Sequence, residues 1–129
     1  MIYVSTDNAL NPSGHYSQAV IHDGLIYISN QLPIDPETGE KRIGTVEEET
    51  ERILMNIEMI LHKAGSNKDH VIRTTVYITD LADWDKVNLV YSRFFGAHKP
   101  ARSVVVVKEL HFGFQVGIEA TAGSNKEQK

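Results

Sequence analysis

The chain has 129 residues, of which 41% are hydrophobic and 23% are charged, and its formal net charge is −4. This length fits one compact domain and this composition is typical of a globular protein, which argues against a second well-packed domain and against a disordered chain. Proteins that bind nucleic acids normally carry a clustered excess of basic residues, whereas this chain is acidic overall, so a nucleic-acid partner is not expected.

The sequence contains no cysteine, which excludes disulfides, thiolate nucleophiles and cysteine-rich zinc sites. Its six histidines do not fall at metal-ligand spacing, so neither a metal site nor a cofactor is expected. No apolar run reaches the roughly 18 residues of a membrane helix, and the first residues lack a signal-peptide pattern. We therefore expect a cytoplasmic protein with no membrane contact.

The first third of the chain predicts a short strand and a hairpin. The expected segments are a strand at 2–4, a loop at 7–14, extended runs at 16–21 and 25–29, and a long connection at 33–44 with a turn near 37–39. Asp23-Gly24 separates the two extended runs and is a strong hairpin signal.

The clearest helix is predicted after Thr45. Apolar residues recur at three- and four-residue spacing from Val46 to Ala64, which is typical of a helix with one buried face. Thr45 and Glu48 form the pattern of a capping box, and Gly65 is expected to end the helix.

The second half predicts a strand, a helix and two more strands. These are a β-branched strand at 71–79, a helix at 84–95 capped by Asp83 and ended by Gly96, a strand at 101–110, and a last strand at 115–122. The run Val104–Val107 suggests a strand that is buried on both faces.

This order of elements predicts an α+β fold with a mixed sheet covered on one face by two helices. The other face also reads as apolar, so we expect a second copy of the chain to cover it. The expected single domain spans 1–123, and 124–129 form a flexible tail because they carry no large apolar residue.

Two charged residues stand in apolar surroundings. Arg102 opens a strand of valines and is expected either to pair with Glu119 or another carboxylate, or to bind a substrate carboxylate through its forked guanidinium. Glu119 lies in an apolar strand and is either a partner in a salt bridge or a proton carrier with a raised pKa.

Six short strings carry a further signal through their joint order and spacing. They are Tyr16-Ser-Gln, Tyr27-Ile-Ser-Asn-Gln-Leu-Pro33, Thr75-Val-Tyr-Ile-Thr-Asp-Leu81, Val87-Asn-x-x-Tyr91-x-x-Phe-Phe95, Pro100-Ala-Arg-Ser103 and Ile118-Glu-Ala-x-Ala122. Together they resemble the RidA/YjgF family from about residue 14 to residue 122. The resemblance implies a chorismate-mutase-like fold, and a homotrimer whose sheets pack into a central barrel with ligand clefts between subunits. It also implies hydrolysis of reactive 2-imino acids or their enamine tautomers to 2-keto acids and ammonia.

The resemblance also implies roles for individual residues. Arg102 matches the arginine that binds the substrate carboxylate, while Tyr16, Ser29 and Asn88 match positions that line the pocket. Val104 stands where a main-chain carbonyl helps to orient water.

The chain departs from the family pattern in the pocket. Asn30 stands where the family commonly has glycine, and Gly117 stands where the family has the glutamate that positions the attacking water. Glu119 matches a second family glutamate on the same face as Gly117, about 6.6 Å farther along the strand. Asn30 and Gly117 are therefore assigned to substrate binding, and Arg102 and Glu119 to catalysis. His15 and His111, which also depart from the pattern, are alternative proton carriers.

The leading hypothesis is a deaminase of 2-iminobutanoate and 2-iminopropanoate. The alternative is a non-catalytic or redirected trimer that binds a small carboxylate metabolite at its subunit interfaces, because Gly117 lacks a carboxylate. A ribonuclease, an older label in the family, is third, because the acidic balance argues against it.

Overall fold

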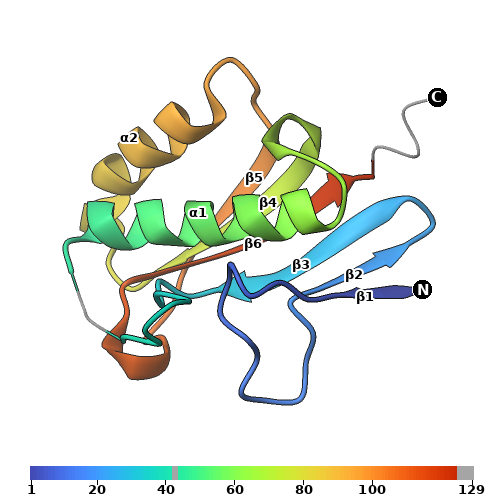
Figure 1. Cartoon of the computed structure of the whole chain (residues 1–129). Coiled ribbons are helices and arrows are strands. Elements are labelled where there is room, and N and C mark those ends of the chain that lie inside the picture. The colour runs from blue at the N-terminus through green and yellow to red at the C-terminus, as the bar shows by residue number, and fades with distance from the viewer. Residues whose placement is uncertain (42–43, 125–129) are drawn as a thin grey trace.

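The computed structural model describes residues 1–41 and 44–124, in which two helices lie on one face of a single sheet (Figure 1). The strands are β1 (Ile2–Val4), β2 (Ala19–His22), β3 (Leu25–Gln31), β4 (Val71–Ile78), β5 (Ala101–Val106) and β6 (Val116–Gly123), and the helices are α1 (Val46–Lys63) and α2 (Trp84–Phe95). Short 3-10 turns lie at Lys68–His70 (η1), Leu81–Asp83 (η2) and His111–Gly113 (η3). The strand order is β1-β2-β3-β6-β4-β5, and only β4 and β5 are parallel. The predicted α+β fold with a mixed sheet is confirmed.

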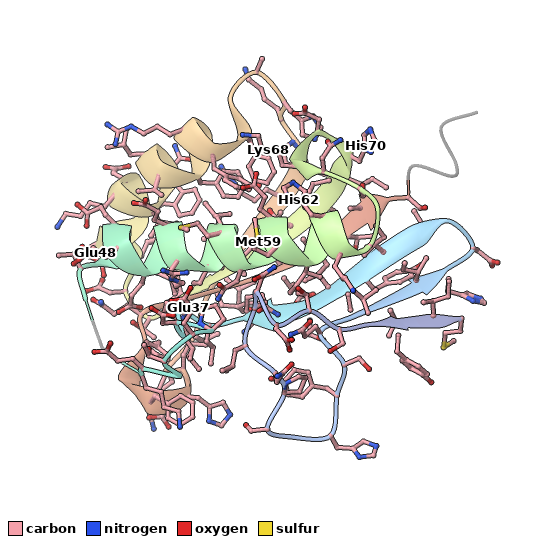
Figure 2. The ribbon with its side chains drawn as sticks, in the orientation of Figure 1. Glu37, Glu48, Met59, His62, Lys68 and His70 are labelled. Carbon is pink, nitrogen blue, oxygen red and sulfur yellow. The ribbon has the colours of Figure 1, made fainter. Side chains whose placement is uncertain are left out.

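Helix α1 has the predicted start and end. Glu48 Oε1 accepts the Thr45 N–H at 2.9 Å and Thr45 Oγ1 accepts the Glu48 N–H at 3.1 Å, which completes the capping box. Figure 2 shows Glu48 at this end of α1 and His62 toward the other end, an order of charges that suits the helix dipole. The apolar stripe of α1 packs onto the sheet through fully buried side chains, among them Ile53, Ile57 and Ile60.

Asp83 occupies the predicted N-cap position of helix α2, and the helix has the predicted bounds, but the expected capping bond is not formed. The Asp83 side chain makes no capping hydrogen bond, because the turn η2 leads directly into the helix. Asp80 caps that turn instead, since its Oδ1 accepts the Ala82 N–H at 2.9 Å. Gly96 ends α2 with a φ of 64°, a backbone region that favours glycine.

The hairpin of β2 and β3 turns at Asp23-Gly24, as predicted, and both residues have positive φ. Strand β2 begins at Ala19 rather than near Tyr16. The buried Gln18 side chain explains the later start, because it is hydrogen-bonded to the backbone of the preceding loop at Thr6, Ala9 and Leu10.

The prediction that the valine strand is buried on both faces is wrong for this chain. Strand β5 ends at Val106 and lies at the edge of the sheet, where, of the strands in the described residues, it pairs with β4 alone. Val104 packs against the core, whereas Val105 is 39% exposed and Val106 is 52% exposed. A run of valines identifies a strand but does not say whether the strand is central or at an edge.

The sheet face opposite the helices is more polar than predicted. At its centre the Tyr77 hydroxyl donates to Glu119 Oε1 at 2.7 Å, and Arg73 donates to Ser103 Oγ at 2.7 Å. Tyr27 and Val105 add exposed apolar area on either side. The prediction of a continuous apolar face is therefore wrong, because polar residues alternate with the core residues of β4 and β6.

The described chain ends beside the hairpin turn. The buried Ser124 donates its N–H to the Gly24 carbonyl at 2.8 Å, so the first residue of the expected tail is attached to the sheet. Residues 125–129 of that tail, like 42–43 of the long connection, lie outside the described residues. Among the described residues, no helix is long and apolar enough to cross a membrane, and no cluster of three potential metal ligands occurs.

Candidate functional site

The first candidate region is a hollow of about 470 Å³ between α2 and β5, here called the arginine hollow. It is lined by Asn88, Tyr91, Ser92, Phe95, Gly96, His98, Lys99, Pro100 and Arg102. Arg102 is the second residue of β5, and it pairs with the buried Thr74 on β4. Since paired residues point to the same face of a sheet, this register directs Arg102 toward the helices.

Three residues of helix α2 hold the Arg102 guanidinium. It donates to Asn88 Oδ1 at 2.9 Å and lies 4.6 Å from the ring centre of Trp84 and 4.9 Å from that of Tyr91. Trp84, Asn88 and Tyr91 stand at i, i+4 and i+7, so one helical stripe supplies all three contacts. Aromatic faces attract the cation, which leaves the exposed guanidinium oriented while its other N–H groups remain available to a ligand.

Tyr91 is held in place by a hydrogen bond with strand β4. Its hydroxyl is 2.7 Å from Thr74 Oγ1, and its side chain is buried. Burial raises the Tyr91 pKa, while the hydrogen bond with Thr74 and the charge of Arg102 act in the opposite direction. The phenol therefore stays neutral near pH 7, so it serves as an aromatic support for Arg102 and contributes no charge.

The predicted ion pair between Arg102 and Glu119 is wrong. Glu119 pairs with Thr75, whereas Arg102 pairs with the adjacent Thr74, so the two charged side chains point to opposite faces. The Tyr77 hydroxyl holds the Glu119 carboxylate, and the donated bond, partial burial and the negative charge all raise the Tyr77 pKa. The role of Glu119 as a proton carrier stays a prediction.

The second candidate region is a hollow of about 300 Å³ at the end of β3, here called the tyrosine hollow. Its lining consists of Leu10, Ser13, Gly14, Tyr16, Asn30, Gln31, Leu32, Ile34, His111 and Phe112. The structure thus brings together Tyr16 and Asn30, which sequence analysis had assigned to one pocket. It also places there His111, one of the two alternative proton carriers.

Phe112 was not predicted as a site residue. It has a φ of 63°, an unusual conformation for a bulky residue, and its ring packs 6.0 Å from that of Phe114 and under Lys41 Nζ at 4.4 Å. Strain of this kind persists where surrounding contacts impose it, often at binding sites. The sequence signal was present, because His111-Phe-Gly-Phe114 places aromatics around a glycine in a loop.

The remaining predicted residues border these hollows less directly. Ser29 Oγ donates to the Ser17 carbonyl at 2.7 Å, so this hydroxyl fastens the end of β3 to the preceding segment. Gly117 on β6 lies beside the Asn30 side chain. Val104 shares the face of Arg102 on β5, a strand whose outer edge has no partner strand among the described residues.

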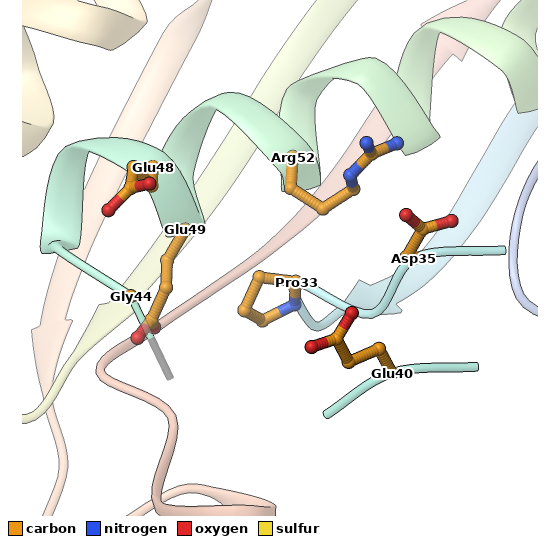
Figure 3. Close-up of a pocket in the computed structure, with 7 residues that line it drawn as sticks. All are labelled: Pro33, Asp35, Glu40, Gly44, Glu48, Glu49 and Arg52. Carbon is orange, nitrogen blue, oxygen red and sulfur yellow. The ribbon is translucent and has the colours of Figure 1, made fainter. Parts of the chain in front are cut away.

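A third hollow, of about 230 Å³, lies beside the start of α1 and has an acidic lining (Figure 3). Two of its acidic side chains, Glu48 and Glu49, already serve the fold. Glu48 belongs to the capping box, and the buried Glu49 accepts the backbone N–H of Gln115 at 2.8 Å and its side-chain N–H at 2.9 Å. We therefore assign this region a structural role.

Within one chain, the arginine hollow and Gly117 are separated. Arg102 and Gly117 lie on opposite faces, and the strand β4 stands between their strands. Their backbones are about 10 Å apart across the sheet and about 10 Å apart along it, judged from strand spacing and rise. One ligand of a few carbon atoms cannot contact both positions in the same chain.

Comparison with known proteins identifies the family. A family model described as Endoribonuclease L-PSP matches residues 6–124. The chain belongs to this family, which is also called RidA/YjgF. The fold and the family predicted from the sequence are thereby confirmed.

Relatives within the RidA/YjgF family carry different descriptions. A RutC family protein of Pyrococcus abyssi is 44% identical over 119 residues, which cover 92% of this chain and 94% of that protein. The human 2-iminobutanoate/2-iminopropanoate deaminase is 40% identical over 119 residues, covering 92% and 87% respectively. The solved structure of E. coli TdcF with bound serine has a TM-score of 0.92 and 34% identity, covering 97% of this chain and all of that chain (100%).

Proposed function

We propose that this RidA/YjgF protein is a deaminase that hydrolyses small 2-imino acids, with Arg102 binding the substrate carboxylate. Water adds to C2 of the protonated imine, and the resulting C2–N bond then breaks. The products are a 2-keto acid and ammonium, whose nitrogen has gained both protons of the water. The deaminase name of the human relative at 40% identity and the small amino acid bound by TdcF support this choice of substrate class.

The observation that carries the proposal is the setting of Arg102. The guanidinium is oriented by Asn88 and two aromatic rings at a hollow of about 470 Å³. In the described part of the chain it forms no ion pair with a carboxylate. An exposed arginine that is held in place but has no anionic partner suits bidentate binding of a small carboxylate.

We further propose that two copies of the chain complete each site in a homotrimer. Arg102 and Val104 lie on β5, an edge strand of the described sheet. Asn88 on α2 lies beside them and accepts a hydrogen bond from Arg102. The tyrosine hollow with Tyr16 and Asn30 belongs to the other half of the sheet, next to Gly117, and Ser29 fastens the strand end beside it. A repeated head-to-tail interface would bring the arginine hollow of one copy against the tyrosine hollow of the next.

Substitution of Arg102 tests the proposal. Arg102→Ala should lower kcat/KM about 100-fold, because charge-assisted hydrogen bonds contribute about 1.5–3 kcal/mol. The kcat/KM of Arg102→Lys should lie between those of Arg102→Ala and the wild type, since lysine keeps the charge but lacks the forked guanidinium. The measurement is keto acid and ammonia release from iminobutanoate generated by a dehydratase, with the exposed Arg93→Ala on α2 as the control. An Arg102→Ala variant as active as the wild type would refute the role of Arg102.

Gly117 supports a second candidate, a binding protein without catalysis. The face that carries Gly117 offers no carboxylate at that position, and Tyr77 already engages Glu119. In that case calorimetry with 2-oxobutanoate would show saturable binding that depends on Arg102, while imine hydrolysis stays at the rate of buffer alone. Hydrolysis above that rate excludes this candidate.

A further inference from the structure

Two departures from the family pattern, far apart in the sequence, meet in space. A Cβ added to Gly117 would lie 2.9 Å from Asn30 Nδ2, 3.0 Å from Oδ1 and 3.3 Å from Cγ. The Asn30 carboxamide therefore occupies the space into which any side chain at position 117 would project. A glycine inside a strand commonly marks such a close approach.

The local backbone explains how Asn30 reaches this position. The register between β3 and β6 shifts between Ile28 and Gln31, so Asn30 lies in a bulge. Bulges redirect side chains, and this one places the Asn30 side chain beside Gly117 and in the lining of the tyrosine hollow.

The Asn30 carboxamide makes no side-chain hydrogen bond within the described part of the chain. Its neighbours are engaged, because Ser29 Oγ donates to the Ser17 carbonyl and Gln31 Nε2 donates to the Ser29 carbonyl. Among residues 1–41 and 44–124, no hydrogen bond involves the Asn30 side chain. An exposed amide with one acceptor and two donors is thus available at the wall of the hollow.

We propose that Asn30 takes over the position left empty by Gly117 and that its carboxamide hydrogen-bonds the polar atom attached to the reacting carbon of the small molecule. The inference rests on the proposed function and refines its ligand class. A neutral amide can donate a hydrogen bond to the 2-oxo oxygen of an anion, whereas an ionised carboxylate can only accept, so the site favours a 2-oxo acid more than a site with a carboxylate at position 117 would. The same amide does not titrate, so it adds no step to the pH dependence of binding.

The test is calorimetric binding of 2-oxobutanoate to the full chain. Asn30→Ala should weaken binding about 3- to 10-fold, the range expected for one neutral hydrogen bond. Gly117→Ala should weaken it equally, since its Cβ displaces the carboxamide without altering Asn30. The double variant should bind 2-oxobutanoate no more weakly than either single variant, because the two substitutions remove the same contact. The exposed Asn8→Ala serves as the matched control.

Asn30→Asp separates contact with the ligand from a packing role. Its carboxylate would repel the anionic ligand, so binding should weaken about 10-fold or more at pH 8 and recover as the aspartate is protonated, near pH 4 for an ordinary aspartate. Wild-type binding should show no such step. Melting temperatures and oligomer masses of all variants would identify any that fail to fold.

Each outcome decides between the two proposals. Wild-type binding that requires Arg102 but is unchanged in Asn30→Ala and Gly117→Ala overturns this inference alone. A pH-independent Asn30→Asp variant also overturns it. If the wild type neither binds 2-oxobutanoate nor hydrolyses the imine, both this inference and the proposed function fail.

Discussion

The arginine hollow and the tyrosine hollow differ in how their polar groups are held. In the arginine hollow a helix and a strand fix the guanidinium through Asn88 at 2.9 Å and two aromatic rings. In the tyrosine hollow a bulge presents the Asn30 amide, which has no hydrogen-bond partner among the described residues, next to a loop that holds Phe112 in a strained conformation. The guanidinium of the arginine hollow is thus held in place before any ligand arrives, whereas the amide of the tyrosine hollow is free to reorient.

The largest expected effect comes from mixing variants that are damaged in different regions. Arg102→Ala inactivates the arginine hollow, and Gly14→Trp should fill the tyrosine hollow, whose lining includes Gly14. If neighbouring copies share each site, coexpressed variants should recover about one quarter of wild-type hydrolysis, because random mixing in a closed ring restores one site in four. If mixed assemblies of confirmed composition recover no activity, neighbouring copies do not share a site.

A smaller effect is expected from Asn88, whose amide orients the anchor. Asn88→Asp should raise KM about 10-fold or more, because the new carboxylate pairs with Arg102 and competes with the substrate. Asn88→Ala should raise KM only about 3-fold, as expected for the loss of one supporting hydrogen bond. Steady-state kinetics separate the two, and a KM for Asn88→Asp no higher than that of Asn88→Ala would contradict the anchoring role of this contact.

The smallest expected effect lies between the two regions, at the Tyr77–Glu119 hydrogen bond. Because the donated bond, burial and the negative charge of Glu119 raise the Tyr77 pKa above its usual value of about 10, the fold favours the neutral phenol. This stabilisation is fully present below about pH 10 and is lost as the pH rises through the higher folded pKa. Glu119→Gln should lower the Tyr77 pKa, so the fold should lose less stability as the pH rises above about 10. Tyrosinate absorbance would measure the pKa, and unfolding at several pH values would measure the stability, with Tyr77→Phe as the reference.

The same variant tests the predicted catalytic role of Glu119. A proton carrier typically contributes about 10²–10⁴ in rate, so Glu119→Gln should then lower kcat at least about 100-fold. A kcat within about threefold of the wild type would leave Glu119 with the structural role that its bond to Tyr77 already shows.

Local sequence patterns predicted the elements because each depends on near neighbours. The capping box at Thr45, the turn at Asp23-Gly24 and the stripe of α1 are all properties of a few adjacent residues. The strand that contains the valine run, β5, was also predicted. Its place at the sheet edge was not, because that place depends on the pairing of β6 between β3 and β4.

For the site, the sequence by itself predicted which residues take part: an arginine at the head of a strand, a tyrosine before the first hairpin, and a glycine at the position where the family has a carboxylate. Only the tertiary structure decided how they combine. Pairing with Thr74 and with Thr75 sends Arg102 and Glu119 to opposite faces, and the bulge in β3 brings Asn30 against Gly117. The physical reason is that a side chain's face and neighbours follow from strand register, which contacts between distant segments fix.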